Sequence, residues 1–217
     1  MKTVALLTVS NGTFAGTGIV SNKVTLYGGV HAPGAPLGMQ KIQGKYSLGS
    51  GAALRIVVHG NAPGAASGVS VQGGTVTLAG TLEISALPSL QTNTSFVIIE
   101  NNDTAPVTGN FLGLPEGAAF FAGGFTWKIS YRGGDGNDVV LTIVARTSPS
   151  VSVFQSRGQL ALGWPEWAEA YQLCAATNLL QPVTWFPLAA PVVLSNAAFY
   201  TVLPSDWYLS FFRLQYP

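Results

Sequence analysis

The stretch VSVQGGTVTLAGTLEI, from Val69 to Ile84, decides the fold. From Val76 onward, apolar or small residues occupy every second position, and the positions between them hold Thr, Ala, Thr and Glu. This period of two predicts a half-buried β-strand. Val69 and Val71 fall on the opposite parity, so Gly73-Gly74 is expected to form a turn or bulge that resets the register.

Similar short strands recur on both sides of this stretch. They are expected at residues 4–9, 19–26, 46–48, 53–58, 69–72, 75–84, 95–100, 125–131 and 138–144. Glycine pairs and Pro-Gly or Asn-Gly turn signals separate them, and the Ala-rich pieces are too broken by Gly or Pro to form a long helix. The pattern predicts an all-β protein, and periodicity alone leaves both a β-sandwich and a β-solenoid open.

The composition narrows the classes of function. Among 217 residues, 47% are hydrophobic and only 9% are charged, against about 25% charged in an ordinary globular protein. Lys plus Arg number 10 and Asp plus Glu number 9, which gives no basic footprint for nucleic acid. No apolar run approaches the roughly 18 residues of a membrane-spanning helix. We therefore expect neither a nucleic-acid partner nor a membrane span.

The single cysteine and the N-terminal sequence bear on the cellular compartment in which the protein is located. Cys174 excludes an internal disulfide framework and a cysteine zinc site. The apolar run at residues 4–7 is very short and lacks a small-x-small cleavage site, so it is interpreted as a strand and no secretion signal is visible. The chain is expected to be the tail of a longer protein.

A series of motifs resembles a known family. Residues 8–38, TVSNGTFAGTGIVSNKVTLYGGVHAPGAPLG, resemble the repeat of bacterial autotransporter-associated β-strand proteins. The later segments LRIVV (54–58), GTVTLAGTL (74–82), GNFLGLPEG (109–117) and GGDGNDVVLT (133–142) continue the pattern in order. The likeness covers residues 5–143 and departs at His31, where the pattern usually has Leu. It implies a right-handed parallel β-helix, with residues 75–144 as its closing coils and a hairpin cap.

The composition changes after residues 147–150, whose sequence TSPS is typical of a linker. Beyond it, LALGWP (160–165) and YQL (171–173) resemble strands B and C of a fibronectin type III-like sandwich. We therefore expect two domains. Residues 1–146 would form the terminal coils and cap of a parallel β-helix, and residues 147–217 a small β-sandwich.

One loop carries a metal motif. Residues 133–141, GGDGNDVVL, match the calcium nonapeptide GGxGxDxUx, with Asp135, Asn137 and Asp138 as candidate ligands. In calcium β-rolls each ion lies between successive repeats, and this chain has one copy. Because a hairpin also demands a glycine-rich Asp/Asn loop, a structural turn is the preferred interpretation, with calcium as the alternative. No other cofactor is expected.

Tryptophans could bind sugars, because an aromatic face stacks on a pyranose ring. Trp164 shares the parity of Leu160 and Leu162 and is expected in the core. Trp167 and Trp207 lie in turn-like contexts and are the candidates for binding a carbohydrate.

No arrangement of residues predicts an enzyme. The nine acidic residues are scattered, and Arg55 and Glu83, both on outward parities, are expected to form a surface ion pair at most. His31 and His59 are not near a Gly-x-Ser-x-Gly elbow, which the sequence lacks, and Cys174 has no identifiable basic partner.

The sequence thus favours a non-catalytic structural or adhesin-type segment of a secreted bacterial surface protein, which caps a β-solenoid stalk outside the cell or at its surface. A cell-surface or extracellular polysaccharide is the candidate partner. The alternatives are a carbohydrate-binding surface protein and, more remotely, a remnant of a β-helix polysaccharide lyase or hydrolase. This interpretation rests on resemblance and fold analogy.

Overall fold

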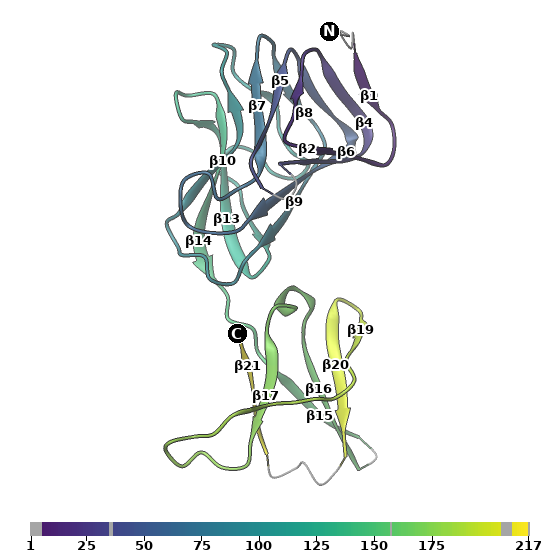
Figure 1. The fold of residues 1–217 in the computed structure, drawn as a ribbon, viewed down its shortest axis with the longest axis vertical. Helices are drawn as coiled ribbons and strands as arrows, with labels where there is room; N and C mark the ends of the chain where they lie inside the picture. The colour runs from purple at the N-terminus through teal and green to yellow at the C-terminus, as the bar shows by residue number, and fades with distance from the viewer. Residues whose placement is uncertain (1–5, 35–36, 157, 205–209, 217) are drawn as a thin grey trace. The chain divides into compact units, whose positions relative to one another are not determined.

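The protein is all-β and divides into two compact units. The computed structural model describes residues 6–34, 37–156, 158–204 and 210–216. Unit 1 spans Met1–Arg146 and unit 2 spans Thr147–Pro217. Strands dominate both units, and the described residues contain a single three-residue 3-10 helix (Figure 1).

The described residues of unit 1 form fourteen strands. They are β1 (Leu7–Val9), β2 (Thr13–Gly16), β3 (Ile19–Val20), β4 (Val24–Pro33), β5 (Met39–Gln43), β6 (Tyr46–Val58), β7 (Gly68–Gln72), β8 (Val76–Leu78), β9 (Thr81–Ala86), β10 (Ser95–Asn101), β11 (Thr108–Gly109), β12 (Ala119–Ala122), β13 (Phe125–Gly133) and β14 (Asp138–Arg146).

These strands form two sheets that are largely parallel. The first sheet has the order β1-β4-β6-β8-β11, with β2 also paired to β4 and β9 also paired to β6, and all its pairs are parallel. The second sheet has the order β12-β13-β14-β10-β7-β5-β3. Its strands β3, β5, β7 and β10 pair in parallel, whereas β10, β14, β13 and β12 pair antiparallel.

The chain alternates between the two sheets as it proceeds. We call one passage through the first sheet and then the second a circuit: β1 to β3, then β4 and β5, then β6 and β7, then β8 to β10. Residues in the same position of successive circuits stack in register, as Leu26, Leu48 and Leu78 do. Leu7 aligns with Val24, Val24 with Tyr46 and Tyr46 with Val76, so each circuit is longer than the one before.

The stretch from Val76 to Ile84 forms two strands, not the single strand that its alternation predicts. β8 ends at Leu78 and β9 begins at Thr81, with a bend at Gly80. A side chain at Gly80 would collide with the carbonyl oxygen of Ala52 in the neighbouring circuit. Because Gly80 lacks a Cβ, the chain can turn at this position while β8 and β9 both remain paired with β6.

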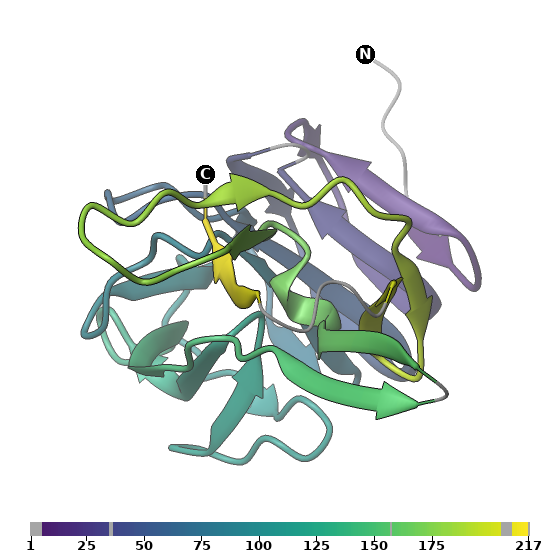
Figure 2. The same ribbon diagram turned by 90° about the horizontal axis from the view of Figure 1, so that it is seen from below.

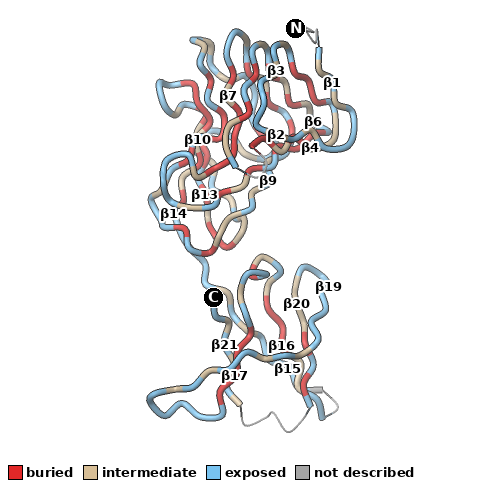
Figure 3. Tube along the Cα trace, in the orientation of Figure 1, coloured by how far each residue is buried: buried red, intermediate tan, exposed pale blue. Residues whose placement is uncertain are grey.

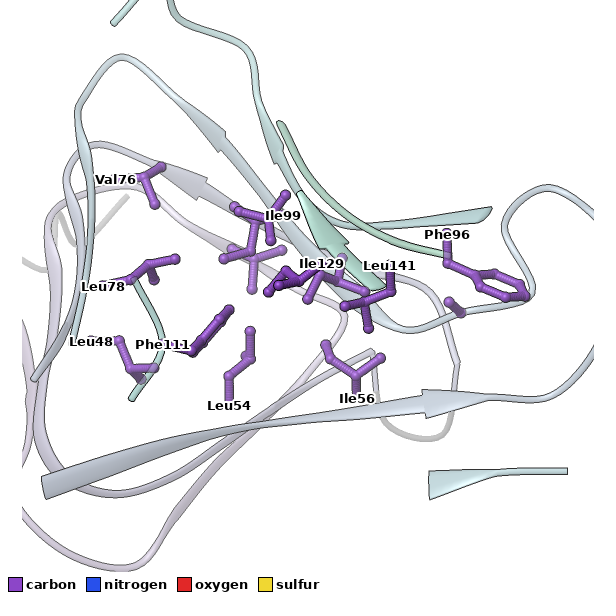
Figure 4. Packing of buried hydrophobic residues seen from close by; sticks show 14 of the residues in the cluster. Leu48, Leu54, Ile56, Val76, Leu78, Phe96, Ile99, Phe111, Ile129 and Leu141 are labelled. Atoms are coloured by element: carbon purple, nitrogen blue, oxygen red, sulfur yellow. The ribbon is translucent and has the colours of Figure 1, made fainter. Parts of the chain in front are cut away.

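The core of unit 1 lies between the two sheets. Leu54 and Ile56 from the first sheet and Ile129 from the second point into the same space (Figure 4). All three are fully buried, and burial of each such side chain contributes about 1.5–3 kcal/mol. Buried positions alternate with intermediate or exposed ones along β13, and with intermediate ones from Val139 to Ile143 on β14, as their sequences predict (Figure 3).

One end of unit 1 is closed by the β13–β14 hairpin and by the loop between β11 and β12. Phe111, 1% exposed, fills the end of the core, and its backbone N–H donates to the Tyr131 hydroxyl at 3.0 Å. The same hydroxyl donates to the Leu114 carbonyl oxygen at 2.6 Å. The Glu116 carboxylate accepts from the Tyr131 backbone N–H at 2.7 Å and from the Ser130 hydroxyl at 2.8 Å. These hydrogen bonds pin residues 111–116 to β13.

Unit 2 is a small antiparallel two-sheet structure. Its elements are β15 (Ser152–Ser156), β16 (Gln159–Pro165), the 3-10 helix η1 (Glu166–Ala168), β17 (Gln172–Ala176), β18 (Phe186–Pro187), β19 (Val193–Ser195), β20 (Ala198–Leu203) and β21 (Phe211–Gln215).

One sheet of unit 2 has the order β15-β16-β20-β19 and the other the order β18-β17-β21. The short helix η1 carries the chain from β16 toward β17 (Figure 2). Leu162, Trp164, Leu173 and Leu203 are buried together between the sheets. Trp164 is therefore a core residue, as its parity predicts.

Candidate functional site

The glycine-rich loop that matches the calcium motif forms the turn between β13 and β14. Gly136 donates its backbone N–H to the Gly133 carbonyl oxygen at 2.8 Å. Gly134 and Gly136 have φ angles of +56° and +113°, which L side chains rarely adopt. The glycines are thus explained by the hairpin itself, and the loop needs no ion to account for them.

Asp138, one of the three predicted ligands, joins β14 to β10. It is 8% exposed, and its Oδ1 accepts the backbone N–H of Asn101 at 2.8 Å. Burial raises the pKa of the Asp138 carboxyl, the hydrogen bond from Asn101 lowers it, and the negative charges of Asp135 and Glu100 raise it further. The geometry gives Asp138 a structural contact between two strands.

The other two predicted ligands meet a loop that the motif does not contain. Asp135 and Asn137 line an open depression of about 380 Å³, which Asn102, Asp103 and Thr104 line as well. The Asn137 Nδ2 donates to the backbone carbonyl oxygen of Asp103. Sequence analysis missed Asp103, because nothing in the spacing places residues 102–104 beside residues 135–137.

No ready-made metal cage surrounds this depression. Within the residues that the structure describes, no three His, Cys, Asp or Glu side chains gather closely enough to hold a metal ion. Two side-chain oxygens nearby are nevertheless buried without a hydrogen-bond partner, the Oδ1 atoms of Asn101 and Asn137. Such groups are uncommon in native proteins and call for a physical explanation.

The predicted sugar-binding tryptophans are only partly described. Trp167 lies in η1 and is half-buried against the core of unit 2. Trp207 lies outside the described residues. An aromatic site that sequence analysis did not single out involves Trp185, because the Arg213 guanidinium lies 4.2 Å from the centre of its ring. This is a cation–π contact.

A second depression, of about 250 Å³, opens between the sheets of unit 2. Trp164, Tyr171 and Phe199 contribute aromatic side chains to its wall, and Glu169 and Gln172 contribute polar ones. The ring centres of Trp164 and Phe199 are 5.9 Å apart. An aromatic wall with a few polar groups is a common lining of small-molecule sites.

The residues considered for catalysis do not form a reactive group. The Arg55 Nε lies 2.8 Å from a Glu83 carboxylate oxygen, and both side chains are nearly half exposed. They form the surface ion pair that their parity predicts. His59 is exposed at the end of its strand, and the Cys174 thiol is buried with the Gln172 carbonyl oxygen 3.8 Å away.

His31 lies in the interior of unit 1 and is 0% exposed. Its Nε2 lies 2.7 Å from the Gln40 Oε1 and its Nδ1 lies 2.8 Å from the Tyr46 hydroxyl. Because the Gln40 Oε1 only accepts, the Nε2 carries the proton and the Tyr46 hydroxyl donates to the Nδ1. Phe14 stacks on the imidazole with ring centres 4.8 Å apart. Burial lowers the pKa of His31 to about 4, although the hydrogen bond to Gln40 opposes this shift.

Comparisons with models of protein families, with curated proteins and with solved structures find no match for this chain. The described residues also form no helix with the length and apolar character needed to cross a bilayer. The fold and the geometry of the sites are therefore the basis for a functional proposal.

Proposed function

We propose that the protein is a non-catalytic structural segment. In this proposal, unit 1 forms the last coils and the cap of a right-handed parallel β-helix of the autotransporter-associated type. Unit 2 is a fibronectin type III-like module for attachment or spacing. The whole would belong to a secreted bacterial surface protein of the adhesin class, located at or outside the cell surface.

The difference between the two ends of unit 1 carries this proposal. At one end, the antiparallel strand β14 ends the parallel ladder of the second sheet, and the first sheet ends in the two-residue strand β11. Phe111 fills the core there, and Tyr131 and Glu116 hold the loop around it. Short strands and covered edges prevent a sheet from recruiting another chain.

The opposite end has the character of a continuing sheet. Among the described residues, β1, β2 and β3 each pair on one side only, with β4 or β5. Phe14 lies half-buried over His31 at this end, so part of the core remains accessible. A parallel edge with an incompletely covered core accepts further coils of the same kind, as in repeat proteins.

The capping role is tested by loosening the closed end. The double variant Tyr131→Phe/Glu116→Ala removes the side-chain hydrogen bonds to residues 111–116. We expect it to self-associate at concentrations where the unmodified protein is monomeric, as measured by sedimentation velocity. The control Arg55→Ala/Glu83→Ala removes an exposed ion pair and should stay monomeric. If hydrogen exchange at Phe111 accelerates in the cap variant while it stays monomeric, the capping role is wrong.

The location is tested with fractionated source cells and an antibody against residues 149–217. A band far above 22.6 kDa in the envelope or medium would support the surface stalk. A band near 22.6 kDa confined to the cytoplasm would refute it.

Binding of a surface or extracellular polysaccharide by unit 2 is the second candidate function. The aromatic wall of the depression between its sheets and the Trp185–Arg213 pair favour it. It predicts retention on an insoluble glycan and loss of that retention in Trp185→Ala, as well as in Trp167→Ala or Trp207→Ala, with a thermal-unfolding measurement to show that each variant is still folded. Failure of the unmodified protein to bind any glycan of a broad panel would remove this candidate.

A further inference from the structure

The depression between residues 102–104 and 135–137 combines negative charge with oxygen atoms from two parts of the chain. Asp103 follows β10, whereas Asp135 and Asn137 belong to the β13–β14 turn. Asp103 also reaches a third segment, because its Oδ2 accepts the backbone N–H of Gly74 at 2.8 Å. At this depression the closing hairpin therefore meets the loop after β10, which is itself hydrogen-bonded to the turn before β8.

The charge at this point is not neutralised by the protein. Among the described residues the structure records one ion pair, Arg55–Glu83, and it does not involve Asp103 or Asp135. Gathering like charges in one place costs free energy unless a counter-charge is present.

A buried oxygen atom without a hydrogen-bond partner is a second observation, independent of the charges, that points to a ligand. Asn137 is only 7% exposed and lines the depression. Its Nδ2 is used by the Asp103 carbonyl oxygen, but its Oδ1 has no hydrogen-bond partner. A buried acceptor left unpaired in this way destabilises the folded state. A bound cation would supply the missing partner.

We propose that this depression binds a calcium ion through the carboxylates of Asp103 and Asp135 and the carboxamide oxygen of Asn137. Calcium takes 6–8 oxygen ligands in flexible geometry, and backbone carbonyl groups and water complete such shells. This ligand set differs from that of the linear motif. Asp138 holds β10 as a positioning residue, and Asp103 enters from another circuit.

The site has two carboxylates, so its affinity is modest. We expect a dissociation constant on the order of 10⁻⁴–10⁻³ M, as in extracellular calcium modules. At such a value, millimolar calcium would fasten the closing hairpin to the loop after β10 and, through Asp103, to Gly74. The inference does not depend on the proposed role as a stalk.

Thermal unfolding of the full chain tests the site. We expect 10 mM CaCl₂ to raise the melting temperature of unit 1 by about 3–10 °C over the value in EGTA. An equal concentration of MgCl₂ controls for ionic strength and should give a smaller rise. Asp103→Asn and Asp135→Asn should each remove most of the calcium response. Glu83→Gln, which changes the charge equally on another surface, should retain it.

A titration followed by NMR locates the ion even if a variant fails to fold. Amide signals of residues 102–104 and 135–137 should shift together and saturate in the millimolar range. The proposal is overturned if calcium leaves the melting temperature unchanged. It is also overturned if the shifts lie elsewhere, or if Glu83→Gln loses as much of the response as Asp135→Asn.

Discussion

Acidification should destabilise unit 1 through His31, which is buried in its neutral form. The pKa of this imidazole falls from 6.5 to about 4 on folding, chiefly because burial disfavours the charged form. Between these two values the unfolded chain binds a proton and the folded protein does not. The free energy of unfolding therefore has its full value, as far as His31 is concerned, above about pH 6.5. It decreases as the pH falls toward 4.

The magnitude follows from the size of the shift. Each pKa unit corresponds to 1.36 kcal/mol, so the full effect of His31 is about 3 kcal/mol. Linkage places about 2 kcal/mol of this loss between pH 7.5 and pH 5. Such a loss is large relative to the about 5–15 kcal/mol by which domains are stable.

Urea unfolding at both pH values, followed by two-dimensional NMR, measures the effect in unit 1 alone. The amide signals of Leu26 and Leu54 serve as reporters, because both residues are fully buried in its core. Following individual residues is necessary because the chain has two units, which need not unfold together.

A triple variant separates His31 from all other titrating groups. In His31→Leu alone, Gln40 and the Tyr46 hydroxyl would remain buried without this partner, at a cost of about 2–4 kcal/mol at neutral pH. His31→Leu/Gln40→Leu/Tyr46→Phe makes the cluster apolar and should recover most of that loss. We expect the triple variant to lose about 2 kcal/mol less than the unmodified protein on acidification to pH 5. Equal losses in the two proteins would refute the reasoning.

Two further substitutions test the packing of unit 1. Gly80→Ala should cost about 1–3 kcal/mol of unfolding free energy, because its Cβ would collide with the Ala52 carbonyl oxygen. Gly18→Ala, which meets nothing within 4 Å, should stay within about 0.5 kcal/mol, and similar losses for both would contradict this account. Glu116→Ala should cost about 2 kcal/mol, because it leaves the Tyr131 N–H without its acceptor. Urea unfolding measures this loss, and an unchanged midpoint would show that the hydrogen bond contributes nothing.

Local patterns in the sequence predict most of the strands and the closing hairpin. The alternation through Trp127, Ile129 and Tyr131 corresponds to buried positions on β13, and Gly133-Gly134 leads into the turn. These features depend on neighbouring residues only, since side chains in a strand alternate between its two faces. Gly80 is the exception, because its effect arises from the close approach of another circuit.

Contacts between distant segments could not be predicted from one sequence. Asp103 meets Asn137 because two loops end at the same edge, and the linear calcium motif contains only one of them. The hydrogen bonds of His31 likewise join three strands, and no local pattern of the sequence predicts them. For Arg55 and Glu83 the sequence predicts that both side chains point outward, and the structure shows that they form an ion pair.

The unequal lengths of the circuits have a consequence for folding. Arrays of identical repeats misfold readily, because any repeat can dock on any other and leave its true neighbour unpaired. Here the stretch from Val24 to Tyr46 is shorter than the stretch from Tyr46 to Val76. If a circuit paired with a circuit other than its native neighbour, the corners of the two would not align. Gly80, which fits against the carbonyl oxygen of Ala52, would then be out of position. The unequal circuit lengths thus favour correct strand pairing, because the corners of each circuit align with those of its native neighbour only.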